Sequence, residues 1–274
     1  MEKKLNSFII SFFILFILSV ILVAIFMAYP YLVKPRYNTE ELKLGANVEV
    51  LANDNQNTLR PTKDYGQEYI DNIVFLGEST TYGLWRYGLL SGGTDTNQVW
   101  TGAMTSGDKT VSSGTLSLSP SIAHSKIYYP DTGSALSISE AVATKKPEYL
   151  VITLGLNNGA SYYSENEFKH CYRLLLDSVN ASSKNTKIIL QSLFPVSKAC
   201  QINAYTPARI DECNSWIYEI SEEYNIKYLN TAEVLKNDEG YLKAEYDNGG
   251  DGIHLNKDGL NAVIEYIRTH GYEG

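Results

Sequence analysis

The chain has 274 residues, of which 44% are hydrophobic and 20% are charged, a composition ordinary for a folded globular protein. Its formal net charge is −8, and no run of basic residues occurs outside the N-terminus. This balance argues against a nucleic-acid partner, because phosphate binding needs clustered lysine and arginine. The length allows one large domain or two small ones.

The N-terminus carries a long apolar segment, residues 8–33, behind the basic pair Lys3-Lys4. A membrane span needs about 20 apolar residues, whereas the core of a signal peptide has only about 7–15. No face of the segment is polar, which argues against a buried core helix. We therefore predict a short cytoplasmic N-terminus (1–7) and an uncleaved transmembrane signal anchor (8–33).

This anchor predicts a single-pass protein of the cell membrane, attached through its N-terminal helix. The positive-inside rule slightly favours a cytoplasmic N-terminus, so the rest of the chain is expected to be extracytoplasmic. Residues 34–65 are polar and rich in asparagine, which predicts a stalk. The folded domain is then expected over 66–274.

From residue 66 onward, short apolar runs alternate with helical patterns, as in a parallel sheet with helices on both faces. The runs are continuous rather than alternating, which suits strands buried on both sides. Strands are predicted at 72–77, 98–100, 148–155, 187–195 and 226–230. Helices are predicted at 165–182, at 206–225, which starts with Thr206-Pro207, and at 256–271, which starts with Asn256.

Polar side chains follow two of the predicted strands, at the edge where ligands bind in such sheets. Ser79 comes directly after the first strand and opens a predicted helix, whose N-terminal N–H groups favour negative charge. Asn157 follows the strand at 148–155, and its amide is able to donate to a developing oxyanion. Taken alone, each has an ordinary explanation, because serine is a common N-cap and Asn-Asn-Gly is typical of turns.

A third polar group, Asp251 and His254, stands just before the last predicted helix. Histidine in this position is able to take a proton from Ser79, while Asp251 fixes its tautomer. An ordinary loop and half of a metal site are the alternatives. The metal site is disfavoured because no other histidine has ligand-like spacing to His254; the others are His124, His170 and His270. No metal or other cofactor is expected.

These three groups, in this order, resemble the sequence blocks of the SGNH, or GDSL-type, hydrolases. The Gly-Asp-Ser block corresponds to Gly77-Glu78-Ser79, and the Gly-x-Asn-Asp block to Gly155-Leu156-Asn157-Asn158. The Asp-x-x-His block corresponds to Asp251-Gly252-Ile253-His254. The resemblance covers about residues 70–270. It implies an α/β fold, a flavodoxin-like three-layer α/β/α sandwich with a central parallel sheet.

The resemblance also implies roles for individual residues. Ser79 is expected to be the nucleophile, His254 the base and Asp251 the residue that orients it. Asn157 and the backbone N–H of Ser79 are expected to form part of the oxyanion hole. The chain departs from the family at Glu78 and Asn158, where the family usually has aspartate, and both changes are expected to alter how the loops around Ser79 are held.

A further glycine completes the oxyanion hole in the family, and Gly102, Gly114 and Gly133 are candidates. We favour Gly102, because "NQVWTG" reads as a strand followed by glycine. Residues 101–121 are then expected to be an inserted loop near the site.

The predicted activity is a carboxylic ester hydrolase acting on small acyl esters, acetyl esters above all, of extracellular or cell-wall carbohydrate. Candidate substrate-binding residues are Trp85, Arg86 and Tyr87, which follow Ser79 closely, and Asn158. The alternatives are an O-acetyltransferase acting on glycans and a catalytically inactive carbohydrate-binding or scaffold protein. The partner is thus an acylated carbohydrate or another small ester.

The chain has three cysteines. Cys171 is expected to be a buried thiol, since it lies in an apolar helical pattern. Cys200 and Cys213 flank one loop, and in an extracytoplasmic domain they are able to form a disulfide.

Overall fold

A computed structural model describes residues 56–272 of the chain. The predicted cytoplasmic segment (1–7), the predicted signal anchor (8–33) and most of the predicted stalk lie outside the described residues. Within residues 56–272, no helix has the length and apolar character needed to cross a membrane.

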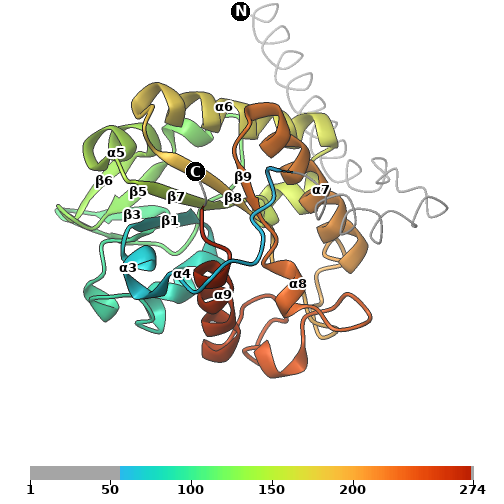
Figure 1. The fold of residues 1–274 in the computed structure, drawn as a ribbon. Coiled ribbons are helices and arrows are strands. Elements are labelled where there is room, and N and C mark those ends of the chain that lie inside the picture. The colour runs from blue at the N-terminus through green and yellow to red at the C-terminus, as the bar shows by residue number, and fades with distance from the viewer. Residues whose placement is uncertain (1–55, 273–274) are drawn as a thin grey trace, which may run out of the picture. The chain divides into compact units, whose positions relative to one another are not determined.

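A parallel sheet of five strands forms the centre of the described domain (Figure 1). Its order is β2 (Val99–Trp100), β1 (Ile73–Gly77), β7 (Tyr149–Thr153), β8 (Lys187–Gln191) and β9 (Lys227–Leu229). All five predicted strands are confirmed. Numbered along the chain, these strands run 2-1-3-4-5, which is the flavodoxin-like order.

The strands are buried on both faces, as their continuous apolar sequences predict. All five residues of β1 are buried. Val74 and Leu76 belong to one hydrophobic core, while Ile73 and Phe75 belong to the other. Successive side chains of a strand point to opposite faces, so the sheet separates two cores that each need a helical cover.

Helices supply that cover on both sides, and the three-layer sandwich is confirmed (Figure 1). One face is covered by α5 (Ile138–Lys145), α6 (Glu165–Ser182) and α7 (Pro207–Tyr224). The other is covered by α3 (Gly66–Asp71), α4 (Ser79–Arg86), α8 (Ala232–Leu235) and α9 (Lys257–Thr269). Short helical turns complete the chain: η1 (Gly93–Asp95), η2 (Ile122–His124), η3 (Leu156–Ala160) and η4 (Ala244–Tyr246).

Capping residues explain where the long helices begin. The hydroxyl of Thr206 accepts the backbone N–H of Arg209, and Pro207 occupies the first turn of α7. The side chain of Asn256 accepts the N–H of Gly259 at the start of α9. Each cap satisfies an N–H group that has no partner within the helix. Both helix starts are therefore as predicted.

Two antiparallel hairpins lie between β2 and α5, and the sequence did not predict them. They are β3 (Ala103–Ser106) with β4 (Lys109–Ser112), and β5 (Lys126–Tyr129) with β6 (Ser134–Ser137). The predicted inserted loop over 101–121 contains the first of these hairpins, at 103–112. The turn between β3 and β4 contains Gly107 at φ +59°, a conformation that glycine adopts readily. β3 has mostly exposed residues, so it leaves no apolar pattern to detect.

The domain begins earlier than residue 66. The backbone N–H of Leu59 donates to Tyr228 O at 2.8 Å, and the N–H of Tyr228 donates to Asn57 O at 2.9 Å. This segment therefore lies beside β9, and the Leu59 side chain is buried. The predicted stalk boundary is corrected accordingly, because residues 56–65 belong to the folded domain.

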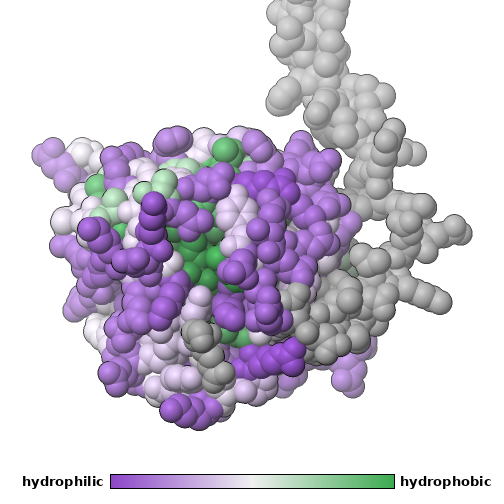
Figure 2. Space-filling view, turned by 45° about the horizontal axis from the view of Figure 1, so that its top comes forward, coloured by the Kyte–Doolittle hydropathy of each residue, from purple (hydrophilic) through white to green (hydrophobic). Residues whose placement is uncertain are grey.

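The surface seen in Figure 2 is mainly hydrophilic, with hydrophobic residues gathered in a strip near its middle.

Candidate active site

The site lies where the order of the sheet reverses. After β1 the chain goes to β2 on one side, and it later returns to β7 on the other side of β1. Such a switch point opens a crevice at the carboxyl ends of the strands, where ligands bind in doubly wound sheets. Gly77, the last residue of β1, is in register with Thr153 of β7. Ser79 and Asn157 therefore emerge from neighbouring strands.

Ser79 is the first residue of α4 rather than its N-cap, a position that Glu78 occupies. Its backbone N–H belongs to the first turn, where N–H groups have no acceptor within the helix. The strand reaches this turn through Gly77, where an added Cβ would lie 2.0 Å from Thr81 Oγ1 and 2.7 Å from Thr153 O. Only glycine fits such a close approach, and the sharp turn directs Ser79 to the open end of the sheet.

His254 joins Ser79 to Asp251. Its Nε2 lies 2.8 Å from Ser79 Oγ, and its Nδ1 lies 2.6 Å from Asp251 Oδ2. The second oxygen of Asp251 accepts the backbone N–H groups of Ile253 at 2.8 Å and His254 at 3.0 Å. The structure thus brings the three predicted catalytic residues into one hydrogen-bonded chain, with the geometry of a serine triad.

The loop that carries this pair is held by tight packing. Gly252 has φ +72°, and an added Cβ would lie 2.5 Å from the backbone N of Cys200. The carbonyl of Gly252 accepts the N–H of Ser197 at 2.8 Å. Burial tends to raise the pKa of Asp251, but the N–H groups of His254 and Ile253 and the His254 ring lower it below 3.8. Asp251 is therefore ionised at neutral pH and able to orient the imidazole.

Asn157 lies on the loop after β7, with an extended backbone (φ −72°, ψ 125°). Its backbone N–H donates to Glu78 Oε2 at 2.8 Å, and its side-chain Nδ2 donates to Leu116 O at 3.0 Å. A side-chain amide has two N–H donors, so one remains for an oxyanion. The following residue, Asn158, adopts φ +66°, which asparagine tolerates better than most residues.

Gly102 follows β2 at the same edge of the sheet. An added Cβ there would lie 1.6 Å from Thr115 O, so no side chain fits. Of the other candidates, Gly114 (φ +68°) packs against the ring of Tyr82, and Gly133 (φ +65°) forms the turn between β5 and β6. The role of Gly102 as an oxyanion donor stays a prediction.

Three of the four candidate substrate-binding residues contact neighbouring parts of this chain. The indole N–H of Trp85 donates to Thr94 O at 2.8 Å, and Trp85 and Tyr87 pack against the core. Asn158 Nδ2 donates to Leu118 O at 3.2 Å, while Arg86 is exposed. Substrate binding by these four residues stays a prediction.

Two residues near Ser79, Tyr82 and Glu78, are not among the predicted site residues. Tyr82 lies one turn further along α4 and stacks on Trp85, with ring centroids 5.0 Å apart. Glu78 has no exposed surface, and its carboxyl group accepts hydrogen bonds from the loop that carries Asn157. In the sequence, Tyr82 is three residues after Ser79, which places both on the same face of a helix. Glu78 directly precedes the predicted nucleophile.

The three cysteines are free thiols, so Cys200 and Cys213 are not joined in a disulfide. Cys171 is buried, as predicted. In the part of the chain that the structure describes, no three histidine, cysteine or acidic side chains are grouped to hold a metal ion.

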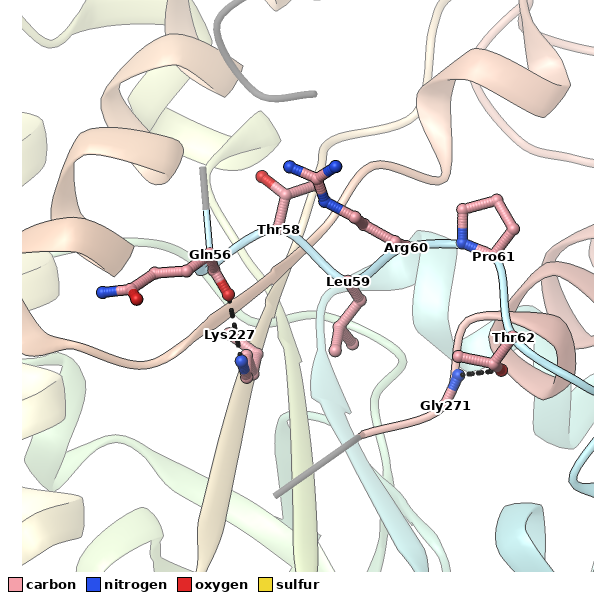
Figure 3. Close-up of a pocket in the computed structure, with 8 residues that line it drawn as sticks. All are labelled: Gln56, Thr58, Leu59, Arg60, Pro61, Thr62, Lys227 and Gly271. Atoms are coloured by element: carbon pink, nitrogen blue, oxygen red, sulfur yellow. Dashed lines mark hydrogen bonds between the residues drawn. The ribbon is translucent and has the colours of Figure 1, made fainter. Parts of the chain in front are cut away.

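A cavity of about 160 Å³ lies away from the triad (Figure 3). It is lined by residues 56 and 58–62, Lys227 and Gly271. Lys227 is the first residue of β9, so the cavity lies toward the amino ends of the strands, and it takes no part in the arrangement around Ser79.

The sequence model of the GDSL-like lipase/acylhydrolase family matches residues 75–262, more than half of the chain. No curated protein matches.

Three solved structures illustrate the similarity. A GDSL-like lipase from Bacteroides thetaiotaomicron is 17% identical, with a TM-score of 0.45, covering 82% of this chain and 96% of its own. A family 3 carbohydrate esterase from Clostridium thermocellum is 16% identical, with a TM-score of 0.45 and coverages of 71% and 91%. The periplasmic domain of a lipopolysaccharide acetyltransferase from Salmonella ser. Paratyphi A is 15% identical, with a TM-score of 0.47 and coverages of 82% and 95%.

Proposed function

The chain belongs to the GDSL-like lipase/acylhydrolase family, and from this premise we propose that it is a serine esterase that removes small acyl groups, acetyl above all, from carbohydrate. The observation that carries the proposal is the pair of contacts made by His254, 2.8 Å to Ser79 Oγ and 2.6 Å to Asp251 Oδ2.

The reaction has two steps. Ser79 Oγ attacks the ester carbonyl carbon while His254 Nε2 takes the hydroxyl proton. The backbone N–H of Ser79 and the free amide N–H of Asn157 donate to the oxyanion, and Gly102 is the candidate for a third donor. The bond to the alcohol oxygen then breaks, and His254 returns the proton to the leaving alcohol. Water attacks the acyl-enzyme in the same way, which releases the acid and restores Ser79.

The surroundings of Ser79 support a short acyl group. Tyr82 lies one turn along α4, and an added Cβ on Gly114 would lie 3.1 Å from its ring. The same segment meets the other side of the site, because Leu116 O accepts the amide of Asn157. A segment packed against α4 one turn beyond Ser79 supports a short acyl chain rather than a long one.

The exposed hydrophobic side chains support a sugar as the alcohol. Among residues 56–272, the large ones are Met104, Tyr162 and Ile202, and each lies on a segment that follows the carboxyl end of a sheet strand. Tyr162 is 79% exposed and lies five residues after Asn157. An aromatic ring presents a broad apolar face with a polar tip, which suits the surface of a sugar ring.

The exposure of the base favours hydrolysis over transfer of the acyl group to a second sugar. The side chain of His254 is 33% exposed and that of Asp251 is 47% exposed. A third of the His254 side chain is thus open to solvent, which supports access of water in the second step. A scaffold without catalytic activity would have no use for the complete triad.

The direct test is hydrolysis of p-nitrophenyl acetate and of an acetylated oligosaccharide by the full-length chain. The wild type is expected to release acetate from both, and a fluorophosphonate probe is expected to label Ser79. Ser79→Ala should lose both activity and labelling while keeping the thermal unfolding temperature of the wild type. Activity retained in Ser79→Ala contradicts the assignment of the nucleophile, and transfer of most acetyl groups to an added sugar favours a transferase.

A further inference from the structure

Glu78 is a buried carboxyl group that the proton relay does not use. It precedes Ser79 in the chain, and none of its surface is exposed. Its Oε1 accepts the backbone N–H of Leu156 at 2.7 Å, and its Oε2 accepts the N–H of Asn157 at 2.8 Å. The backbone N–H of Gly155 also donates to this carboxyl group. Each of the two Glu78 oxygens thus accepts a hydrogen bond from the loop after β7.

The other half of this loop is held by a group of opposite charge. Arg209 is 7% exposed, and its guanidinium donates to the carbonyls of Ala160 at 2.9 Å, Gly159 at 3.1 Å and Tyr163 at 2.5 Å. The hydroxyl of Tyr205 donates to Leu156 O at 3.0 Å. These loop carbonyls are thus satisfied without Glu78, while the N–H groups of Leu156 and Asn157 depend on Glu78.

A buried carboxyl is a costly way to stabilise a core. Removing such a group from water has a large free-energy cost, which its hydrogen bonds must offset. Burial is the main cause that raises the pKa of Glu78 to about 8, against the effect of the three N–H groups. The titratable side chains that feel its charge are Tyr172 and Tyr205; burial raises the pKa of each, and the charge of Glu78 raises it further. No cation faces Glu78 among these partners, so its contacts are with the loop itself.

We propose that Glu78 is a positioning residue that acts through Asn157, holding the backbone of Asn157 so that its amide faces the oxyanion. The nucleophile and the oxyanion donor are thereby joined across neighbouring strands by one side chain adjacent to Ser79. The extra methylene of glutamate, relative to the aspartate usual in the family, sets how far the loop stands from Ser79. This inference rests on the proposed function, since it assumes that Asn157 binds the oxyanion.

A double-mutant cycle on p-nitrophenyl acetate hydrolysis by the full-length chain tests the inference. The variants are Glu78→Gln, Asn157→Ala and the two combined. Glutamine keeps the shape of glutamate, but its NH₂ group cannot accept a hydrogen bond. Glu78→Gln should therefore lower kcat by about 10- to 100-fold, with KM within about threefold of the wild type. Because the two residues act as a unit, the double variant should be no slower than Asn157→Ala by more than about threefold.

Glu140→Gln is the matched control, because Glu140 also accepts a backbone N–H, that of Ser137 at 2.7 Å, but at the start of α5. It should keep the wild-type kcat. A wild-type kcat in Glu78→Gln overturns the inference. So does a double variant whose fold-loss in kcat equals the product of the two single losses. If Glu78→Gln does not fold, the same cycle with Glu78→Asp gives the same decision. An inactive wild type instead contradicts the proposed function.

Discussion

Asp251 binds His254 with both of its carboxylate oxygens. One oxygen accepts the backbone N–H of His254 at 3.0 Å, and the other lies 2.6 Å from ring Nδ1. The first contact fixes the loop, and the second fixes the ring and its tautomer. Because the two residues are only three apart, one turn of loop is enough to orient the base before it meets Ser79.

Asp251→Asn separates these two functions. An asparagine keeps an oxygen for the backbone N–H groups, but its NH₂ group faces Nδ1 and favours the wrong tautomer of His254. We expect the fold to be retained and kcat to fall by about 10³- to 10⁴-fold. Steady-state kinetics on p-nitrophenyl acetate measure the effect, with circular dichroism as the check on folding. A variant within tenfold of the wild type would show that Asp251 does not set the tautomer.

Asn157→Ala removes the side-chain donor to the oxyanion. We expect kcat to fall by about 10²- to 10³-fold. The matched control is Asn72→Ala, because Asn72 Nδ2 also donates to a carbonyl at 3.0 Å, that of Glu68, at the opposite end of β1. The control should keep the wild-type kcat. Equal losses in the two variants would mean that Asn157 serves the fold rather than the reaction.

Glu78 makes stability depend on pH. Burial raises its pKa from 4.5 to about 8. Between these values the folded chain holds a proton that the unfolded chain has released, so the free energy of unfolding falls as the pH rises. Glu78→Gln removes this dependence. Urea unfolding at about pH 5 and about pH 8.5 should show the wild type losing stability relative to the variant at the higher pH. An unchanged difference would contradict the raised pKa.

Arg209→Ala leaves three loop carbonyls without their donor. Those of Gly159 and Ala160 are in a buried part of the loop, so we expect a loss of about 1–3 kcal/mol in the free energy of unfolding. Arg173→Ala is the control, since Arg173 pairs with Glu223 on an exposed surface, and it should cost about 0.2–1 kcal/mol. Urea unfolding measures both variants. Equal costs would show that the loop does not depend on Arg209.

Tyr162→Ala tests the sugar-binding part of the proposed function. We expect KM for an acetylated oligosaccharide to rise by about two- to tenfold, because one aromatic contact is lost. The kinetics on p-nitrophenyl acetate should not change, since that ester has no sugar, and Tyr162→Phe should behave as the wild type. A KM that rises equally for both esters would assign Tyr162 to the fold around the site.

Much of the architecture was predictable because its causes are local. The helix at 165–182 was predicted with the observed bounds, from apolar residues at spacings of three and four. The five sheet strands were predicted because strands buried on both faces must be apolar throughout. The hairpin of β3 and β4 was not predicted, because exposed strands need no apolar pattern.

The sequence by itself determined the residues that could do chemistry, and it set the Asp251–His254 pair, because a contact between residues three apart needs only one loop. Tertiary structure alone decided that His254 meets Ser79, which is 175 residues distant in the chain. It also decided that Glu78 holds Asn157 rather than facing solvent. The Glu78–Asn157 contact depends on β1 and β7 lying side by side, whereas the His254–Ser79 contact depends on α9 packing against α4. Both arrangements are properties of the whole packed domain, which no local pattern encodes.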